Sequence, residues 1–328
     1  LDKSAGLVLT YAEVDKVTEY RIDDAQITIS GGKFITRANN FTGTTGGNAY
    51  YFGRGIDIYR SNTVIDGIDH LIVDEVDSSN YRGSSPYGGF ISTSNCSDVT
   101  IKNSTLQAHR QYKHPTNGTW AGTYDIGASL ANNITYKNVK QRGFDPNNVW
   151  NVYNEDGTLK KAVVDDNIKT WGIMGTNYCK NFTWDTCVLS RFDAHAGVYN
   201  ATIKDSKVNE IALIGGGTAN IINTHVYSRQ NNILQLRGDY GSTWNGDLNI
   251  TDVTFHNCKP VTINENGTKN VTPWMAIMRI QYYNHDFGYQ TYLPRNINIT
   301  NFNVCQGSGC EHSGHQTTNK TTSGGGGL

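Results

Sequence analysis

The stretch "KNFTWDTCVL" (180–189) is followed by "YNATIKDSKV" (199–208), which has the same form, with Thr183 and Thr202 about 19 residues apart. Each phrase runs from an apolar residue through Thr to Trp or Ile, and then to a polar pair and another apolar position. This alternation predicts a short strand that ends in a polar turn. A unit of about 20 residues cannot bury a core alone, so neighbouring units must stack.

The phrase recurs along most of the chain, and longer intervals between copies indicate inserted loops. A second apolar strand precedes each copy, as "WGIMGT" (171–176) and "FDAHAG" (192–197) do. Each unit therefore has two or three short strands, seven or more times over. The L-x-x-L-x-L frame of leucine-rich repeats is missing, and a propeller blade needs about twice this length. The other copies are "SDVTIKNSTL" (97–106), "NNITYKNVK" (132–140), "TANIINTHV" (218–226), "GDLNITDVTF" (246–255) and "RNINITNFNV" (295–304).

This repeat resembles that of the right-handed parallel β-helix, or pectin-lyase-like, superfamily. The resemblance spans residues 24–305 and implies an all-β solenoid in one domain. In that fold, inward residues form apolar stacks and turn asparagines form ladders. Residues 1–23 are predicted to be an N-terminal cap or lead-in, and residues 306–328 a flexible tail rich in Gly and Thr. The resemblance rests on the form of the repeat, and one fold carries many functions.

Composition excludes several classes of partner. Charged residues are 17% of the 328, and the formal net charge is −1. Without a Lys/Arg run, neither nucleic acid nor an anionic membrane is predicted as a partner. No apolar run approaches the 18 residues of a membrane span. No metal or cofactor is predicted: the acidic pairs in 21–26, 153–157 and 164–167 indicate turns, and calcium is the ion they would hold if they bound one.

Twelve N-x-S/T sequons predict a glycosylated protein that is extracellular or at the cell surface. The alternative is that a structural repeat uses Asn and Thr at this spacing. The six cysteines lack zinc spacing and leave disulfides and buried free thiols both open. Cys96 and Cys179 have the same place in their repeats and are interpreted as turn or core residues. The sequon asparagines are Asn40, Asn95, Asn103, Asn117, Asn133, Asn181, Asn200, Asn249, Asn266, Asn270, Asn298 and Asn319.

The stretch "SRFDAHAGVYNATI" (190–203) carries the strongest candidate site. Arg191, Asp193 and His195 alternate with Phe192 and small apolar residues, so they are expected on one outward strand face. A carboxylate two residues from an imidazole suits acid–base chemistry. The competing interpretation is a solvated sheet face whose charges discourage association between sheets.

Aligning the second strands places Asp125 in the outward column of Asp193, two coils away, and places Tyr124 inward. At the strand spacing of about 4.8 Å, the two carboxylates would be roughly 10 Å apart. That is near the upper limit for the two carboxylates of an inverting glycosidase. His195 would lie opposite Gly127, which leaves room for a ligand. Asp193, His195 and Asp125 are therefore the predicted catalytic residues.

Three further stretches are predicted to contact a sugar chain. The loop "AHRQYKHPTNGTW" (108–120) supplies cations beside this face. "LQLRGDYGSTWNGD" (234–247) and "YYNHDFGYQTYLP" (282–294) combine a cation or imidazole with Asp and aromatic rings. Such mixtures suit sugar rings, and they equally suit a folded loop packed on the solenoid. The predicted substrate-binding residues are Arg191, His109, Arg110, Lys113, Arg237, Asp239, Tyr240, His285 and Asp286.

The sequence thus favours an extracellular, carbohydrate-active protein that cleaves a polysaccharide on the outward strand face. Lyase and glycoside hydrolase chemistry both remain open. The alternatives are a non-catalytic structural or adhesive rod, which could self-assemble or attach through its C-terminal tail, and a carbohydrate-binding module without turnover. An enzyme requires titratable groups within about 10 Å of one groove, whereas a fibre requires complementary ends or edges.

Overall fold

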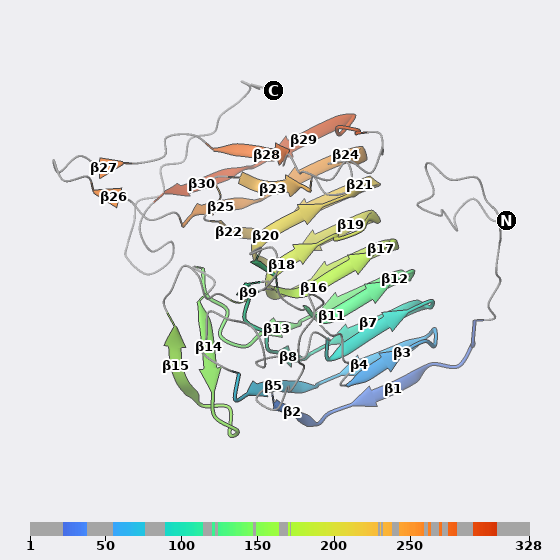
Figure 1. Ribbon diagram of the computed structural model, residues 1–328. Coiled ribbons are helices and arrows are strands. Elements are labelled where there is room, and N and C mark those ends of the chain that lie inside the picture. Colours follow the sequence, from blue (N-terminus) through green and yellow to red (C-terminus); the bar gives the residue numbers. More distant parts are fainter. Residues whose placement is uncertain are drawn as a thin grey trace.

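The computed structural model describes residues 22–37, 55–75, 89–113, 120–121, 124–146, 149–163, 170, 172–228, 230, 232–237, 243–258, 262–263, 269–270, 275–280 and 291–306. These residues form strands and turns that stack as successive coils (Figure 1). No helix among them is long and apolar enough to cross a membrane. Most of the predicted lead-in (1–21) and most of the predicted tail (307–328) lie outside the described residues.

The repeated phrases form the first sheet, in which every pair of neighbouring strands is parallel. Thr183 pairs with Thr202, and Thr202 with Asn220, so the 19-residue spacing predicted from the sequence is the register of the sheet. The first sheet consists of β1 (Ile27–Ser30), β4 (Thr63–Asp66), β7 (Ser97–Lys102), β12 (Asn132–Lys137), β17 (Cys179–Asp185), β19 (Val198–Lys204), β21 (Gly215–Ile222), β24 (Trp244–Thr251) and β29 (Asn296–Thr300).

After the first-sheet strand, each coil adds strands in a second and a third column. β18 (Val188–Asp193) and β20 (Lys207–Leu213) run through both columns and join them into one sheet. The other strands of the second column are β2 (Lys33–Arg37), β5 (Asp69–Val73), β8 (Thr105–Leu106), β13 (Lys140–Gln141), β22 (His225–Ser228), β25 (Thr254–Asn257) and β30 (Asn303–Gln306). Those of the third column are β3 (Ile56–Ile58), β6 (Ile91–Ser94), β11 (Tyr124–Ser129), β16 (Gly172–Asn177), β23 (Asn232–Leu236) and β28 (Ala276–Ile280).

The stacked coils make the chain a right-handed parallel β-helix of the pectin-lyase-like superfamily, as the repeat predicts. Antiparallel pairing occurs only in insertions, within the residues described. These pairs are β9 (Tyr112–Lys113) with β10 (Trp120–Ala121), β14 (Trp150–Tyr153) with β15 (Leu159–Val163), and β26 (Thr262–Ile263) with β27 (Lys269–Asn270).

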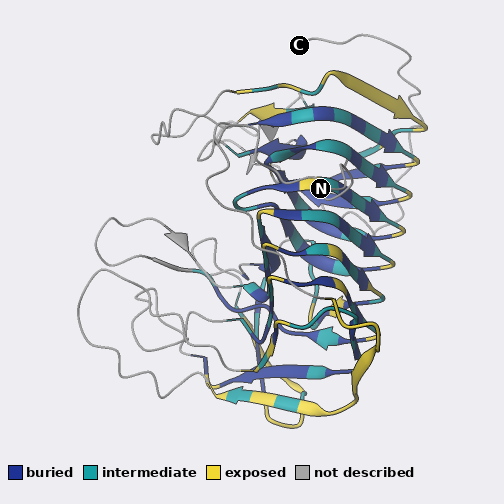
Figure 2. Cartoon of the chain, turned by 90° about the vertical axis from the view of Figure 1, so that its right-hand side faces the viewer, coloured by how far each residue is buried: buried dark blue, intermediate teal, exposed yellow. Residues whose placement is uncertain are grey.

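The core is a set of apolar stacks between the sheets. Ile65, Ile101, Tyr136, Trp184 and Ile203 follow one another along one inward position of the first sheet, and all are buried. Such burial contributes about 25 cal/mol per Å² of apolar surface, which makes the stack the main source of stability. β1 and β29 are exposed (Figure 2), since each has a described neighbour on one side only.

The corner between the first sheet and the second column is formed by one residue in the left-handed region, with φ between 42° and 72° in every described coil. Gly, Asn and Asp adopt this conformation most readily. Asn138 donates from Nδ2 to Asn103 Oδ1 at 3.0 Å, and Asn103 donates to Asp66 Oδ1 at 2.8 Å. This corner ladder confirms the predicted stacking of turn asparagines. The corner residues are Gly31, Gly67, Asn103, Asn138, Thr186, Asp205, Asn223, Asp252 and Asn301.

Candidate functional site

The outward face of the third column carries the predicted site, but in a different register. Ser92, Gly127, Gly175 and Asp193 share one outward column. The alignment that placed Asp125 there was wrong by two residues. A shift of two residues preserves the period-two pattern of a strand, so alternation alone could not exclude it. Gly127 is therefore the neighbour of Asp193 in this column, across Gly175.

Asp193 is fully buried within a cluster of charged side chains, which we call the Asp193 cluster. Arg237 Nη1 lies 2.8 Å from Asp193 Oδ1 and 3.0 Å from Oδ2, and Arg191 Nη2 lies 2.9 Å from Oδ2. The Tyr124 hydroxyl donates to Oδ2 as well. Arg191 also approaches Glu210 Oε1 at 3.8 Å. Side chains from the third, fifth, sixth and seventh coils thus meet at one carboxylate.

Two glycines of β16 allow Tyr124 to reach Asp193 across the intervening coil. A Cβ added at Gly175 would lie 2.7 Å from two atoms of the Tyr124 ring. A Cβ added at Gly172 would lie 3.3 Å from the same ring and 3.1 Å from Arg191 Cβ. Both distances are too short for real side chains, so these positions require glycine for steric reasons. The interpretation of Tyr124 as an inward residue was wrong, because its hydroxyl contacts the outward-facing Asp193.

The electrostatics of the cluster keep Asp193 ionised. Burial alone would raise the pKa of Asp193, but Arg191, Arg237 and the Tyr124 hydroxyl outweigh it, and the pKa lies below its usual range. Burial raises the pKa of Tyr124 well above its ordinary value, so the phenol keeps its proton. Asp193 is therefore a fixed anion at neutral pH and cannot donate a proton there.

His195 follows Asp193 on the same face and is partly exposed. Its Nδ1 lies 3.1 Å from Asn177 Oδ1, while Asn177 Nδ2 donates to Ser129 Oγ at 3.3 Å. A carbonyl oxygen only accepts, so Nδ1 carries the hydrogen, and in neutral imidazole Nε2 is then the acceptor. His195 lies beside Asn177 and not opposite Gly127 as predicted, because Asp193 pairs with Gly175. The arrangement presents a base next to a fixed anion.

The surface above Gly127 is open: a Cβ added there would meet no atom within 4 Å. Ser92 and Ser129 beside it are only partly buried. Small residues let a ligand lie close to the backbone. We call this surface the Gly127 strip; it leads along the outward face toward His195 and the Asp193 cluster. Its members are Ser92, Ser94, Gly127 and Ser129.

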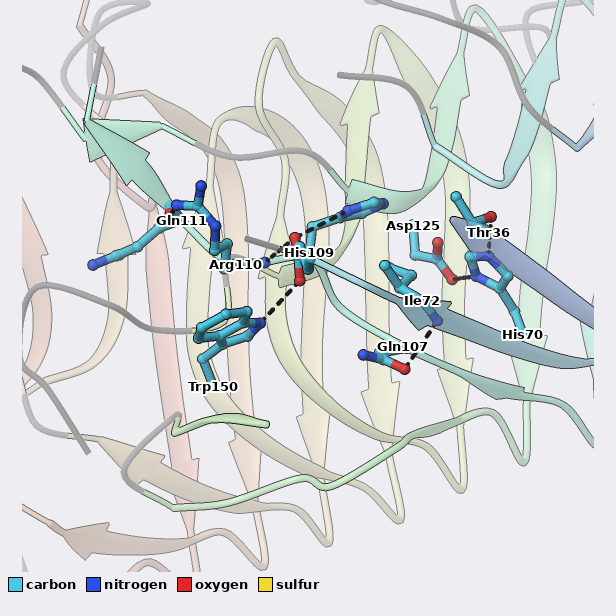
Figure 3. Close-up of polar contacts among 10 residues, drawn as sticks. Thr36, His70, Ile72, Gln107, His109, Arg110, Gln111, Asp125 and Trp150 are labelled. Atoms are coloured by element: carbon cyan, nitrogen blue, oxygen red, sulfur yellow. Dashed lines mark hydrogen bonds and ion pairs between the residues drawn. The ribbon is translucent and has the colours of Figure 1, made fainter. Parts of the chain in front are cut away.

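Asp125 faces the interior and not the strip. His70 Nδ1 lies 2.8 Å from Asp125 Oδ2, and His70 Nε2 lies 2.8 Å from Thr36 Oγ1 (Figure 3). The His70 ring stacks on Phe90 with a centroid distance of 4.0 Å. Asp125 and His70 are 0% and 1% exposed. The prediction that Asp125 is an outward carboxylate paired with Asp193 was therefore wrong.

His109 and Arg110 are buried around a carboxylate that the sequence did not single out. The backbone N–H of Arg110 donates to Glu75 Oε1 at 3.0 Å, and Trp150 Nε1 donates to Glu75 Oε2 at 2.9 Å (Figure 3). His109 Nδ1 lies 3.5 Å from Glu75 Oε1. Glu75 thus ties the segment after β8 to β14. Both predicted sugar-contacting side chains have 2% exposure, which gives a ligand little access to them.

The other predicted substrate-binding residues divide into two groups. Arg237 and Arg191 both reach Asp193, so the structure brings these two together. Of Lys113, only the backbone in β9 is described. Glu210 was missed by the sequence analysis, since a single glutamate in a repeat carries no pattern. Asp239, Tyr240, His285 and Asp286 lie outside the described residues.

The described cysteines have no disulfide partners. Cys96, Cys179, Cys187 and Cys258 are free and buried, in agreement with the interpretation of Cys96 and Cys179 as core or turn residues. Burial raises the pKa of Cys179 to about 11 and that of Cys187 to about 12. Among the described residues, no three His, Cys, Asp or Glu side chains cluster closely enough to hold a metal ion.

No protein-family model matches the chain, and no curated protein matches it by sequence. Among solved structures, a mutant pectin methylesterase in complex with a hexasaccharide is similar over 84% of this chain and 86% of its own, at 10% identity and a TM-score of 0.32. The Streptococcus pneumoniae surface protein and adhesin PfbA is similar over 85% and 83%, at 11% identity and a TM-score of 0.29. ORF18 of Geobacillus virus E2 is similar over 86% and 53%, at 12% identity and a TM-score of 0.28. At these identities the likeness extends to the fold alone.

Proposed function

We propose that the protein is an extracellular enzyme that binds a polysaccharide along the Gly127 strip and cleaves it with His195 as the general base. The observation that carries the proposal is the orientation of His195. Its Nδ1 is held by Asn177, at 3.1 Å, which leaves Nε2 as the acceptor beside the open surface at Gly127.

This geometry favours elimination over hydrolysis. Hydrolysis by the usual route uses two carboxylates flanking the bond, and Asp125, the predicted partner of Asp193, faces the interior. In an elimination, His195 Nε2 takes the proton next to the carboxylate of a uronate. The electron pair forms a carbon–carbon double bond, the glycosidic C–O bond breaks, and the leaving oxygen takes a proton from solvent. An acidic polysaccharide is therefore the proposed substrate class.

Asp193 has a supporting role in this proposal. It is ionised and buried, and it interacts electrostatically with His195. A nearby anion favours the protonated imidazole that forms when His195 takes a proton. Arg191 and Arg237 hold the carboxylate in position, since both lie within 3.0 Å of it. Asp193 is thus a positioning and electrostatic residue in the proposed mechanism.

The test is a screen of the purified protein against acidic and neutral polysaccharides, recording reducing ends and the absorbance of unsaturated uronate products. Gly127→Leu fills the open surface without touching the Asp193 cluster, and Thr135→Leu adds similar bulk to the outward face of the first sheet. We expect turnover with rising absorbance in the wild type and in Thr135→Leu, and loss of turnover in Gly127→Leu. Equal turnover by Gly127→Leu would refute the strip as the binding surface.

A non-catalytic rod is the second candidate, and the full burial of Asp193 favours it. A carboxylate that two arginines and a tyrosine saturate can also serve to lock neighbouring coils together. If no polysaccharide on a broad panel is cleaved while the protein is folded, the rod becomes the better account. Binding without cleavage, lost in Gly127→Leu, would indicate a carbohydrate-binding module instead.

A further inference from the structure

The sequons of this chain differ sharply in what their asparagines do. Six of the seven whose side chains the structure describes belong to hydrogen-bonded ladders. In a ladder within the first sheet, Asn133 donates to Asp98 Oδ1 at 3.0 Å, Asn181 to Asn133 at 2.9 Å, and Asn200 to Asn181 at 2.9 Å. The other three ladder members are Asn103, Asn249 and Asn298.

Asn181 is the most fully engaged of these amides. Its Nδ2 lies 2.9 Å from Asn133 Oδ1 and 3.2 Å from Asn132 Oδ1, and its own Oδ1 accepts from Asn200. Both amide hydrogens thus face acceptors. Neighbouring coils are only about 4.8 Å apart, so the next rungs flank the amide on both sides. A sugar on this nitrogen would remove one hydrogen bond and crowd the adjacent rungs.

Asn95 lies at a different corner, between β6 and β7, and its side chain makes no hydrogen bond within the described part of the chain. It is exposed, with φ of 52°. The next residues along this corner are Leu130 and Tyr178, also in the left-handed region and 59% and 51% exposed. Neither carries an amide side chain, so no ladder forms here. The corner directs its side chains into solvent.

We propose that the folded protein accepts an N-linked glycan at Asn95 and excludes one at Asn181. The sugar comes from an activated donor through an external transferase. A bond forms between Asn95 Nδ2 and the anomeric carbon, the bond from that carbon to the donor phosphate breaks, and the amide loses one proton. Leu130 beside Asn95 offers an apolar surface for the first sugar ring. The ladder asparagines thereby have a structural explanation that needs no glycan.

The test uses folded protein made in a bacterial cytoplasm and incubated with a soluble N-glucosyltransferase and UDP-glucose. Because this enzyme meets the chain after folding, the geometry of the fold decides which sequons react. Peptides of residues 91–102 and 177–188 calibrate the intrinsic reactivity of the two sequons. We expect both peptides to react, and Asn95 in the folded protein to be modified at least tenfold faster than Asn181, by peptide mass spectrometry.

Two variants make the assignment specific. Asn95→Gln removes the acceptor, and the modification at this position should disappear. Thr183→Ala removes the sequon of Asn181 but leaves its ladder amide in place, and the modification at Asn95 should not change. Equal rates at Asn95 and Asn181 in the folded protein, or an unmodified Asn95 beside a reactive peptide, would overturn the proposal. Neither result depends on whether the protein cleaves a polysaccharide.

Discussion

Asp193→Asn tests the account of the Asp193 cluster most severely, because it removes one charge and almost no volume. Arg191 and Arg237 would then lie within 3.0 Å of a neutral amide, and both would stay charged. Removing one partner of a buried ion pair costs about 3–5 kcal/mol, since the remaining charge is left uncompensated. At roughly 2 °C per kcal/mol for a chain of this size, Tm should fall by about 6–10 °C.

The effect should depend on pH in one direction. The pKa of Asp193 is lower in the folded protein than its ordinary value. Its contribution to stability is therefore complete above the unfolded pKa, about 3.9, and is lost as pH falls through the lower folded value. The difference in Tm between wild type and Asp193→Asn should be full at pH 7 and should shrink below about pH 4.

The assay is thermal unfolding followed by far-UV circular dichroism at pH 7 and pH 3. Asp57→Asn is the matched control, since Asp57 lies in the same outward column and is exposed. It should melt within about 1 °C of the wild type at pH 7. If Asp193→Asn melts as high as Asp57→Asn at pH 7, the ion pairs contribute nothing measurable and the reasoning about the cluster is wrong.

Three further changes probe separate parts of the structure. Gly175→Ala puts a methyl group 2.7 Å from the Tyr124 ring and should cost about 1–3 kcal/mol in urea unfolding, whereas Gly127→Ala, with nothing within 4 Å, should be neutral; equal effects would contradict the packing described. Cys187, with its pKa raised to about 12 by burial, should react with a disulfide reagent only after denaturation, and rapid labelling of the native protein at pH 8 would argue against that burial. Asn181→Ala removes a central rung and should lower stability by about 1–3 kcal/mol, and an unchanged urea midpoint would mean that water replaces the ladder.

The fold could be predicted because its information is repeated. The spacing from Thr183 to Thr202 gives the length of one coil, and the sheet register reproduces it. Apolar alternation identified the inward stacks, and asparagine at the turns indicated ladders. Each copy of the phrase confirms the others, so an error in one coil does not change the architecture.

The site is less predictable because it depends on single residues that depart from the repeat. Asp125 and Gly127 are both compatible with the same alternation, and only the pairing of backbones separates them. Tyr124 turns outward because glycines on the next coil leave space for its ring. Glu75 and Trp150 meet through insertions that carry no periodic pattern. Asp193, His195 and Arg237 were found because they stand beside recognisable strands.

The central claim is that His195 acts as the base on a polysaccharide lying along the Gly127 strip. The most direct measurement is kcat of His195→Ala on a polymer that the wild type cleaves, with Tm of both proteins measured in the same buffer. Loss of a general base predicts a fall in kcat of about 10²–10⁴-fold, with Tm changed by no more than about 2 °C. A folded His195→Ala that keeps kcat within about threefold of the wild type would contradict the claim.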